Sequence, residues 1–310
     1  MDLQPMESSD MSELLLRRRN LLLRKQEELN IRAVCFEADG EQTVSITKVG
    51  SAPTIIMQYS YDGVNWDAWD LSALQFGGST KVYVRGVRNE RFGADGSNYN
   101  QITFSTDAFV YVSGIVESLL DGENEVLTLG TKGILRQLFY QQTALRSAEG
   151  LRFEAQSTAT NVSSVYALMF DGCTNLLYAP KVLPANDFKG PYNYQYMFRD
   201  CKSLITAPEL PATVLAPQCY QYMFYGCTSL VNAPELPATT LTESCYFKMF
   251  YGCTSLKTIR CRAKTTASSA TVYWLYGASS SGTFYGYSEY GWATGASGIP
   301  SGWEFVELTD

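Results

Sequence analysis

The second half of the chain repeats one phrase at a nearly constant interval, and this repeat limits the folds that are open to it. The phrase reads CYQYMFYGCTSLVNAPELPATTL from Cys219 and starts again as CYFKMFYGCTSLKTIRC from Cys245. Its Met-Phe pair falls at 169–170, 197–198, 223–224 and 249–250, so the steps are nearly equal. A period of about 26 residues lies within the range of roughly 20–50 that is typical of stacked supersecondary units. We therefore expect residues 136–310 to form a solenoid, with a divergent C-terminal cap from about residue 265.

Each repeat has an apolar part and a proline-containing part. Cys-Tyr-x-x-Met-Phe places its apolar side chains at i, i+3 and i+4 spacing, which predicts a short helix with these residues inside. The following Cys-x-Ser-Leu is expected to lead into a brief strand. Ala-Pro-x-Leu-Pro-Ala cannot be regular helix, because its prolines lack N–H donors and fix φ. The structural positions of the interior are expected to be Cys173, Cys201, Cys227, Cys253, Phe170, Phe198, Phe224 and Phe250.

The eight cysteines raise the question of disulfides or metal. Stacked repeats would place the four regularly spaced cysteines in one row. Zinc sites use ligand pairs that lie close together in the sequence, and the much wider spacings of the repeated cysteines do not supply them. In a protein made in a reducing cytosol, we expect thiols that fill space between turns, with a disulfide such as Cys253–Cys261 as the alternative. We expect neither a metal nor a cofactor.

Residues 32–135 have the pattern of a β-sandwich. Residues 43–47 alternate between apolar and polar as a half-buried strand does, and residues 55–61 run into the hairpin signal Asp62-Gly63. Further short apolar runs follow at about ten-residue spacing, with turn residues between them.

Residues 1–31 are predicted to form a helical arm. Asp10 and Glu13 have the spacing of a capping box, and no Gly or Pro interrupts residues 11–29. Such a leucine-rich segment needs a surface to bury against, either its own chain or a sibling or host particle. The arm residues of interest are Leu15, Leu22, Leu29, Arg17, Arg18 and Arg19. The expected fold class is thus α+β, with an N-terminal helix, a sandwich and a solenoid.

The composition argues against several function classes. The chain has no histidine, the commonest general base near neutral pH and the commonest metal ligand. Its formal net charge is −7, so nucleic acid is not expected as a partner, because that affinity depends on neutralising phosphates. We expect no ordinary export route and no membrane span, since neither a secretory signal pattern nor an apolar run of roughly 20 residues is present. Carboxylate-only glycosidase chemistry stays open, although no pair of acids stands out by its setting.

The tyrosines of the repeats fall into two groups. Those of the Cys-Tyr position are expected in the core. Tyr225 and Tyr251 occupy a position that holds Asp171 and Arg199 in other repeats, so we expect them to be exposed. With Tyr192 and Tyr222, which are expected near them in register, they could stack on sugar rings or anchor a protein partner. The alternative is that these tyrosines are simply solvated or form subunit contacts.

The repeats resemble the BspA-like leucine-rich repeats of surface proteins of gut anaerobic bacteria and of appendage proteins of their phages. The resemblance covers about residues 136–310 and depends on CYxxMFxGCTSLxxAPxLPATTL and on the closing WLxGxxxxGTF and SGIPSGW phrases. The segments YSYDGVNWDAW and KVYVRG are similar to the β-module that often precedes such repeats. This resemblance implies adhesion or structural display and no catalysis.

The expected function is therefore a non-enzymatic virion appendage: a head fibre, a capsid decoration or a tail fibre. By analogy it would be a homo-oligomer, with a trimer as the guess. Its arm would meet other virion proteins, and its repeats would meet a glycan or protein of the host surface. A bacterial cell-surface adhesin that has lost its leader is the alternative, and a glycan-active enzyme is a third hypothesis.

Overall fold

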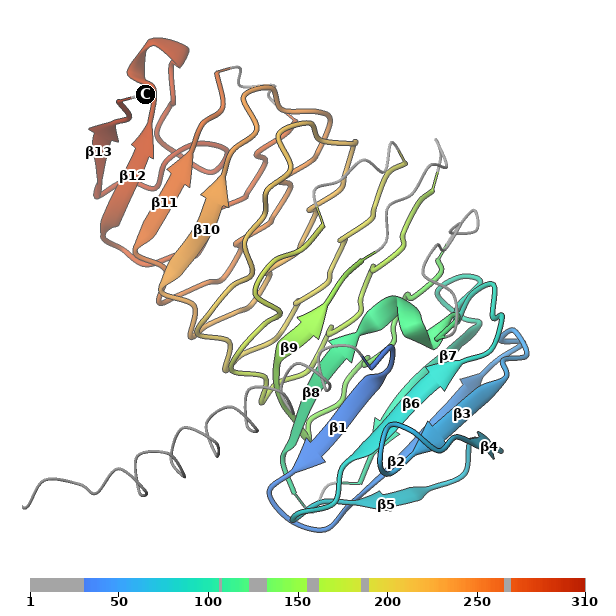
Figure 1. Ribbon diagram of the computed structural model, residues 1–310. Coiled ribbons are helices and arrows are strands. Elements are labelled where there is room, and N and C mark those ends of the chain that lie inside the picture. The colour runs from blue at the N-terminus through green and yellow to red at the C-terminus, as the bar shows by residue number, and fades with distance from the viewer. Residues whose placement is uncertain are drawn as a thin grey trace, which may run out of the picture.

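The computed structural model describes residues 31–105, 108–122, 133–154, 162–184, 190–264 and 269–309. Strands of the first part form two sheets, and the rest of the chain winds into a stack of coils beside them (Figure 1). The strands of the first part are β1 (Val34–Ala38), β2 (Gln42–Val49), β3 (Met57–Ser60), β4 (Asp67–Trp69), β5 (Leu74–Phe76), β6 (Val82–Gly86), β7 (Tyr99–Phe104) and β8 (Val110–Ile115). Those that follow are β9 (Leu145–Arg152), β10 (Asn232–Leu236), β11 (Thr258–Cys261), β12 (Gly282–Gly286) and β13 (Trp303–Glu307).

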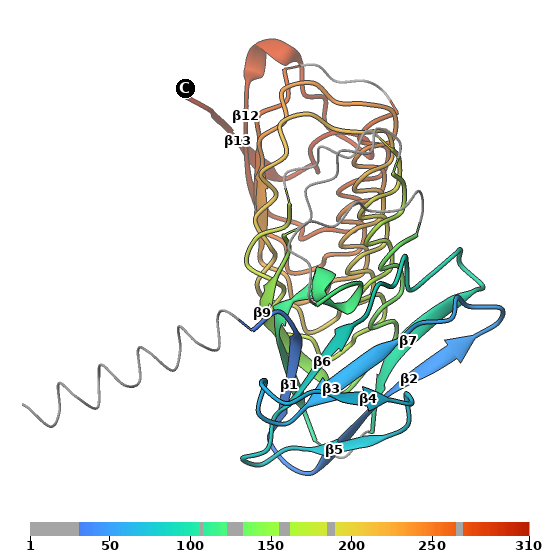
Figure 2. The same cartoon turned by 45° about the vertical axis from the view of Figure 1, so that its right-hand side comes forward.

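The first part is a sandwich of a six-stranded sheet, ordered β4-β3-β6-β1-β8-β9, and a three-stranded sheet, ordered β5-β2-β7 (Figure 2). Alternating side chains fill the space between them: Val34 and Phe36 of β1 and Val44 of β2 are fully buried. Phe36 of the larger sheet meets Phe104 of the smaller one edge to face, with ring centroids 5.4 Å apart. Burial of one face of each strand follows from the period-2 alternation of the sequence.

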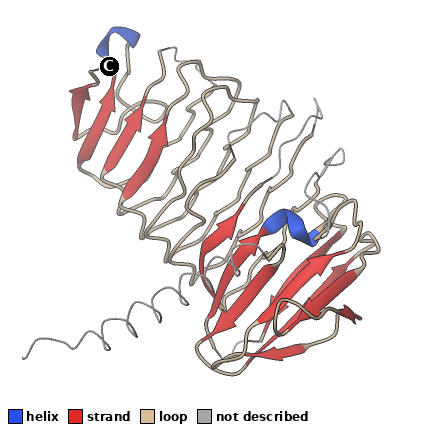
Figure 3. Ribbon diagram, in the orientation of Figure 1, coloured by secondary structure: helices blue, strands red, loops and turns tan. Residues whose placement is uncertain are grey.

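The larger sheet leads into the coils through a parallel ladder. β8 pairs with β9 in parallel, and parallel bridges then join Ser147 to Tyr178 and Tyr178 to Thr206. The last four strands continue this side of the stack as a parallel sheet ordered β10-β11-β12-β13. One side of the coils is therefore β-structure, in strand arrows or in single bridges (Figure 3).

The other side of each coil is a ribbon of tight turns. Within a ribbon, every second backbone N–H donates a hydrogen bond to the carbonyl three residues earlier, as Met197 N–H does to the Tyr194 carbonyl at 3.2 Å. The amides between them donate to the next coil, as Phe198 N–H does to the Met223 carbonyl at 2.9 Å. Every fourth residue has a positive φ, for example 58° at Tyr196. We call this side the turn ribbon.

These observations correct the predicted fold class. The α+β prediction is wrong, because the residues that the structure describes contain no α-helix, only the short 3₁₀ helices η1 (Val116–Leu119) and η2 (Ser288–Tyr290). The short helix predicted for Cys-Tyr-x-x-Met-Phe is wrong as well, since this stretch is turn ribbon. The physical reason is that a ribbon repeating every four residues also directs i, i+3, i+4 and i+7 inward. The predicted helix of residues 1–31 lies, up to residue 30, outside the described residues.

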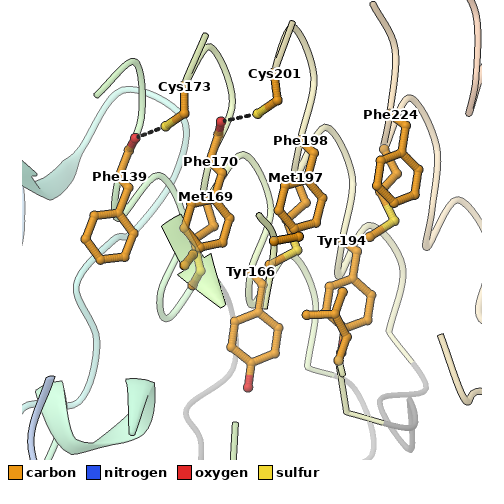
Figure 4. Close-up of a cluster of buried hydrophobic side chains, with 14 of the residues drawn as sticks. Phe139, Tyr166, Met169, Phe170, Cys173, Tyr194, Met197, Phe198, Cys201 and Phe224 are labelled. Carbon is orange, nitrogen blue, oxygen red and sulfur yellow. Dashed lines mark hydrogen bonds between the residues drawn. The ribbon is translucent and has the colours of Figure 1, made fainter. Parts of the chain in front are cut away.

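The interior of the coils is a set of ladders in which the same side chain recurs one coil further on (Figure 4). Phe139, Phe170 and Phe198 stack nearly parallel at centroid distances of 5.5 and 5.3 Å. A second row stacks Tyr166 on Tyr194 at 5.6 Å. The rows continue through Phe224 and Phe250 and through Tyr220, Tyr246 and Trp274.

The last coil is closed by tryptophans. Trp274 ends the tyrosine row, stacks on Trp292 at 5.6 Å, and donates its indole N–H to the Gly298 carbonyl at 2.7 Å. Trp303 donates to the Ser279 carbonyl at 2.8 Å. These contacts cover the apolar end of the ladder, which an open stack would expose to water.

Candidate binding surface

The predicted binding tyrosines lie on the turn ribbon, and three of the four come together. Tyr225 stacks on Tyr251 with ring centroids 4.8 Å apart and planes within 6°, and Tyr222 leans against Tyr225 at 5.8 Å. Tyr192 takes no part in these ring contacts. We define the aromatic surface as Tyr196, Tyr222, Tyr225, Phe247, Lys248, Tyr251, Tyr273 and Tyr276, which are all partly or well exposed.

Two short ladders of rings run along the stack axis on this surface. One joins Tyr196 to Tyr222 at 4.6 Å, and the other joins Tyr225, Tyr251 and Tyr276 at 4.8 and 5.2 Å. Tyr276, at the end of the second ladder, is 53% exposed. The spacing is set by the coils, whose backbones bond in register, so each ring sits one coil above its neighbour.

Lys248 lies among these rings. Its Nζ is 5.6 Å from the ring centroids of both Tyr222 and Tyr251, 5.4 Å from that of Phe247 and 5.8 Å from that of Tyr273. Cation–π attraction of this kind holds an ammonium in place while leaving its outer side to water or a ligand. The aromatic surface therefore presents a positive charge at its centre.

The stacking decides how the rings can bind. Tyr251 has a stacked ring on each side, Tyr225 and Tyr276, whereas Tyr222 has Tyr196 stacked on one side and Phe247 edge-on at 5.3 Å. Tyr196 has Tyr222 against it and the Arg199 guanidinium 4.6 Å from its centroid. A sugar could stack on Tyr251 only if a neighbouring ring moved, whereas Tyr225, at the end of its ladder, has one stacked neighbour. Tyrosine hydroxyls one coil apart can also form hydrogen bonds to a ligand.

A second cation near the surface is already neutralised. Arg199 makes a two-pronged contact with Asp171, at 2.9 Å from Nε and 2.6 Å from its terminal nitrogen. Burial raises the pKa of the Asp171 carboxyl, and the Arg199 guanidinium opposes that rise. Of the two cations, Arg199 has both a carboxylate and a ring as partners, whereas Lys248 lies near rings.

Sequence reasoning missed Tyr196, Phe247, Lys248, Tyr273 and Tyr276. The repeat itself held the signal, because Tyr196, Tyr222 and Lys248 occupy the same position of three successive repeats. Counting in the same way matches Tyr192 to Gln218, not to Tyr222. The choice of Tyr192 therefore came from proximity in sequence rather than from the register of the coils.

The repeated cysteines lie inside the coils as free thiols. Each Sγ–H donates to a phenylalanine carbonyl of the preceding coil: Cys173 to Phe139 at 3.0 Å and Cys201 to Phe170 at 3.1 Å (Figure 4). Cys227 and Cys253 do the same to Phe198 and Phe224. Desolvation raises the pKa of every one of these thiols, and that of Cys253 to about 12. The repeated Phe170, Phe198, Phe224 and Phe250 are fully buried in their own row.

The other predictions concern the N-terminal arm, metal ions and the membrane. Leu15, Leu22, Leu29, Arg17, Arg18 and Arg19 of the predicted arm lie outside the described residues. Within the described ranges, no group of three or more Cys, Asp or Glu side chains is arranged to hold a metal ion. In the same part of the chain, no helix has the length and apolar character needed to cross a bilayer.

Comparison with known proteins gave no relatives: no family model, no curated protein and no solved structure matches the chain significantly.

Proposed function

We propose that this protein is a non-enzymatic attachment protein of a virion surface, present as a head fibre, a capsid decoration or a tail fibre. The observation that carries the proposal is the aromatic surface, where partly exposed rings are held in register around Lys248. Clustered exposed aromatic side chains are unusual on a surface that binds nothing. The resemblance of the repeats to BspA-like repeats and the lack of histidine support display rather than catalysis.

The proposed ligand is a polysaccharide of the host surface that carries hydroxyl and carboxylate groups. Tyrosine hydroxyls repeat along the stack at the coil spacing, so a polymer lying along the axis could bond to several of them. Lys248 would meet a carboxylate, with the charge-assisted hydrogen bond that an ammonium forms. A protein partner with acidic side chains has related chemistry and is the alternative outcome of the test.

Attachment would depend on several such surfaces acting together. A single partly exposed surface of polar contacts binds weakly, because each hydrogen bond replaces one to water. A homo-oligomer, with three copies as the proposed number, would raise the overall affinity through effective concentration. The sandwich end, which carries residues 1–31, would be the end held in the particle.

The test compares binding of two full-length variants to host cells and to their purified surface polysaccharide. Tyr222→Phe/Tyr251→Phe/Lys248→Met removes two hydroxyls and the charge while keeping the ladders. Tyr178→Phe, at a 37% exposed tyrosine on the β side of the coils, is the matched control. We expect the triple variant to lose at least about tenfold in affinity, or roughly 1.4 kcal/mol, and the control to bind as the wild type does. Equal binding of all three proteins would refute the proposal.

Location in the particle is tested separately. Mass spectrometry of purified virions should find the chain as a stoichiometric component. Recovery of the chain only from the bacterial envelope would instead favour the cell-surface adhesin.

A further inference from the structure

The six-stranded sheet has a hollow on its outer face, opposite the sandwich core. It has a volume of about 310 Å³ and is lined by residues of four adjacent strands and of the segments next to them. Its floor is formed by small residues: Ala33 just before β1, Cys35 from β1, Ser113 and Gly114 from β8, and Gly150 from β9. We call this hollow the outer trough.

The outer trough is apolar and separate from the main core. Ala33, Cys35 and Tyr83 form a cluster of their own, with Ile31 and Trp66 packed against it. In an antiparallel sheet with one face in the core, the other face normally carries polar side chains toward water. Small and apolar residues at these positions are therefore a sign that something covers this face. The Glu37–Lys81 ion pair, at 3.3 Å, marks one side of the rim.

The chain enters the sandwich at this trough. Ile31, the first described residue, is part of the lining. Arg32 is tied to Glu154 by an ion pair of 2.8 Å, and Ala33 N–H donates to the Ile31 carbonyl at 3.0 Å in a tight turn. The described part of the chain therefore starts at the rim of the trough, where the ion pair fixes the position of Arg32.

Residues 1–30 are the most leucine-rich segment of the chain. Leucine occupies positions 14–16, 21–23 and 29, all within reach of Ile31 along the sequence. Left in water, so many large apolar side chains are unfavourable, because the hydrophobic effect scales with exposed apolar area.

We propose that the leucine-rich segment of residues 11–29 docks in the outer trough of its own chain. The same chain is the occupant we choose because a segment tethered at the rim has an effective concentration in the millimolar range, which a separate copy does not reach at ordinary protein concentrations. The inference does not depend on the aromatic surface. This docking corresponds to the first of the two interpretations that the sequence left open, packing of the segment on its own chain.

Cys35 in the floor of the trough reports whether the site is covered. Burial raises the pKa of its thiol to about 12, and the neighbouring Glu37 adds to the rise. The facing charged groups are Glu37 and Lys81 on the rim, with Arg152 from β9. Docked leucine side chains would keep reagents away from Cys35, so uncovering the trough would expose the thiol and speed its alkylation, which proceeds through the thiolate.

The experiment measures alkylation of Cys35 in the full chain by mass spectrometry. We expect Leu21→Ser/Leu22→Ser/Leu23→Ser to raise the rate by at least about tenfold, because the reagent could then reach the thiol. Arg17→Ser/Arg18→Ser/Arg19→Ser changes three neighbouring residues without removing leucine and should leave the rate as in the wild type. The seven buried thiols of the coils should stay unmodified in each variant, which shows that the chain remains folded. An unchanged rate in the leucine variant would contradict the proposal.

A second measurement identifies the occupant. Leu22→Cys and Leu29→Cys are oxidised separately, and the products are run on a non-reducing gel. A disulfide to Cys35 within one chain, seen as a faster-running monomer and confirmed by peptide mapping, supports the proposal. A covalent dimer would show that a second copy occupies the trough and would overturn it. Failure of both variants to form any bond to Cys35 would overturn it as well.

Discussion

The sandwich and the coils bury apolar side chains with different backbone conformations and hydrogen-bond patterns. In the sandwich, antiparallel strands such as β2 and β7 pair over six consecutive positions, and positive φ values occur mainly in the connections, as at Leu71. In the coils, pairing runs to the next coil, and the turn ribbon needs a positive φ at every fourth residue, whether it is Gly226 or Tyr222. A positive φ is unfavourable for a side chain larger than glycine, on the order of 1–2 kcal/mol per residue. The coils sustain it because each strained residue is flanked by bonds to both neighbouring coils.

The two regions also differ in what their interiors contain. The sandwich has one cysteine on its outer face, whereas the coils hold seven buried thiols and a row of buried tyrosines. The coils are therefore stabilised by groups that must remain protonated. This difference suggests experiments that separate the two regions.

Alkaline pH should unfold the coils before the sandwich. The thiols of Cys253 and Cys261 have their pKa raised by burial from 9.0 to about 12, and that of Cys245 to about 11. A raised pKa means that the folded state holds the proton, so this stability is complete below pH 9 and is lost as pH rises toward 12. The other buried thiols of the coils have their pKa raised as well, so alkaline pH acts on several groups of the coils together.

The measurement is urea unfolding between pH 8 and 12, with hydrogen exchange to assign the region that opens. Cys219→Ala/Cys245→Ala should make the loss of stability of the coils with pH less steep, and Cys35→Ala should leave the pH dependence of the coils unchanged. If the stability of the coils and that of strands β1–β8 fell with pH in the same way, the prediction that the coils unfold first would be wrong.

Removing one ring from the phenylalanine row should be the largest single-residue effect. Phe198 is fully buried and stacks on Phe170 and Phe224, at 5.3 and 5.6 Å. Phe198→Ala should cost about 3–5 kcal/mol, as is usual for a buried ring, and Phe36→Ala in the sandwich should cost a similar amount. Because stacked repeats contact only their neighbours, opening caused by Phe198→Ala should be concentrated in the coils around residue 198.

Hydrogen exchange provides the comparison. Loss of protection in β1 and β6 equal to that around residue 198 would mean that sandwich and coils open as one cooperative unit.

Loss of an ion pair between coils should lower the free energy of unfolding by less than loss of a buried ring does. It should lower it by more than loss of an exposed ion pair does. Asp171 is 3% exposed and Arg199 32% exposed, whereas Lys181 and Glu149, 3.6 Å apart, are both more than half exposed. Asp171→Asn should cost about 1–2 kcal/mol, since the remaining cation can still reach water. Glu149→Gln, the matched control, should be too small to resolve in denaturant unfolding. A larger loss for Glu149→Gln than for Asp171→Asn would reverse the ranking.

The smallest effect expected is the loss of one thiol hydrogen bond. Cys201→Ala removes the bond to the Phe170 carbonyl, at 3.1 Å, and leaves a small void. The expected cost is about 1 kcal/mol in the free energy of unfolding. Cys35→Ala, where no coil ladder is interrupted, serves as the comparison and should cost less.

The sequence period was enough to predict the interior of the coils but not their backbone. Met197, Phe198 and Cys201 could be assigned inward from their spacing, because inward positions recur once per coil. The same spacing suits a helix and a turn ribbon, and only hydrogen bonds to the next coil, one repeat further along the chain, distinguish them. Local patterns do not report such bonds.

The surface features show a similar division. Tyr222, Tyr225 and Tyr251 could be found by comparing repeats, and Lys248 could have been found by counting one repeat onward from Tyr222. The outer trough could not, because β6, β1, β8 and β9 bring Tyr83, Cys35, Ser113 and Gly150 together only after the sheet has formed. Sheet order depends on long-range pairing, which no single segment encodes.

The translational hydrogen bonding of the coils has a consequence for how such a molecule can change in length. The backbone carbonyls and inward rings that one coil offers to the next recur in each repeat. A coil that is added by duplication, or the join left by a deletion, therefore faces neighbours with the matching groups. The tryptophan closure and the sandwich would be unaffected by such an event. The reach of the molecule can therefore be adjusted one coil at a time, by gene duplication or by design, without redesigning either end.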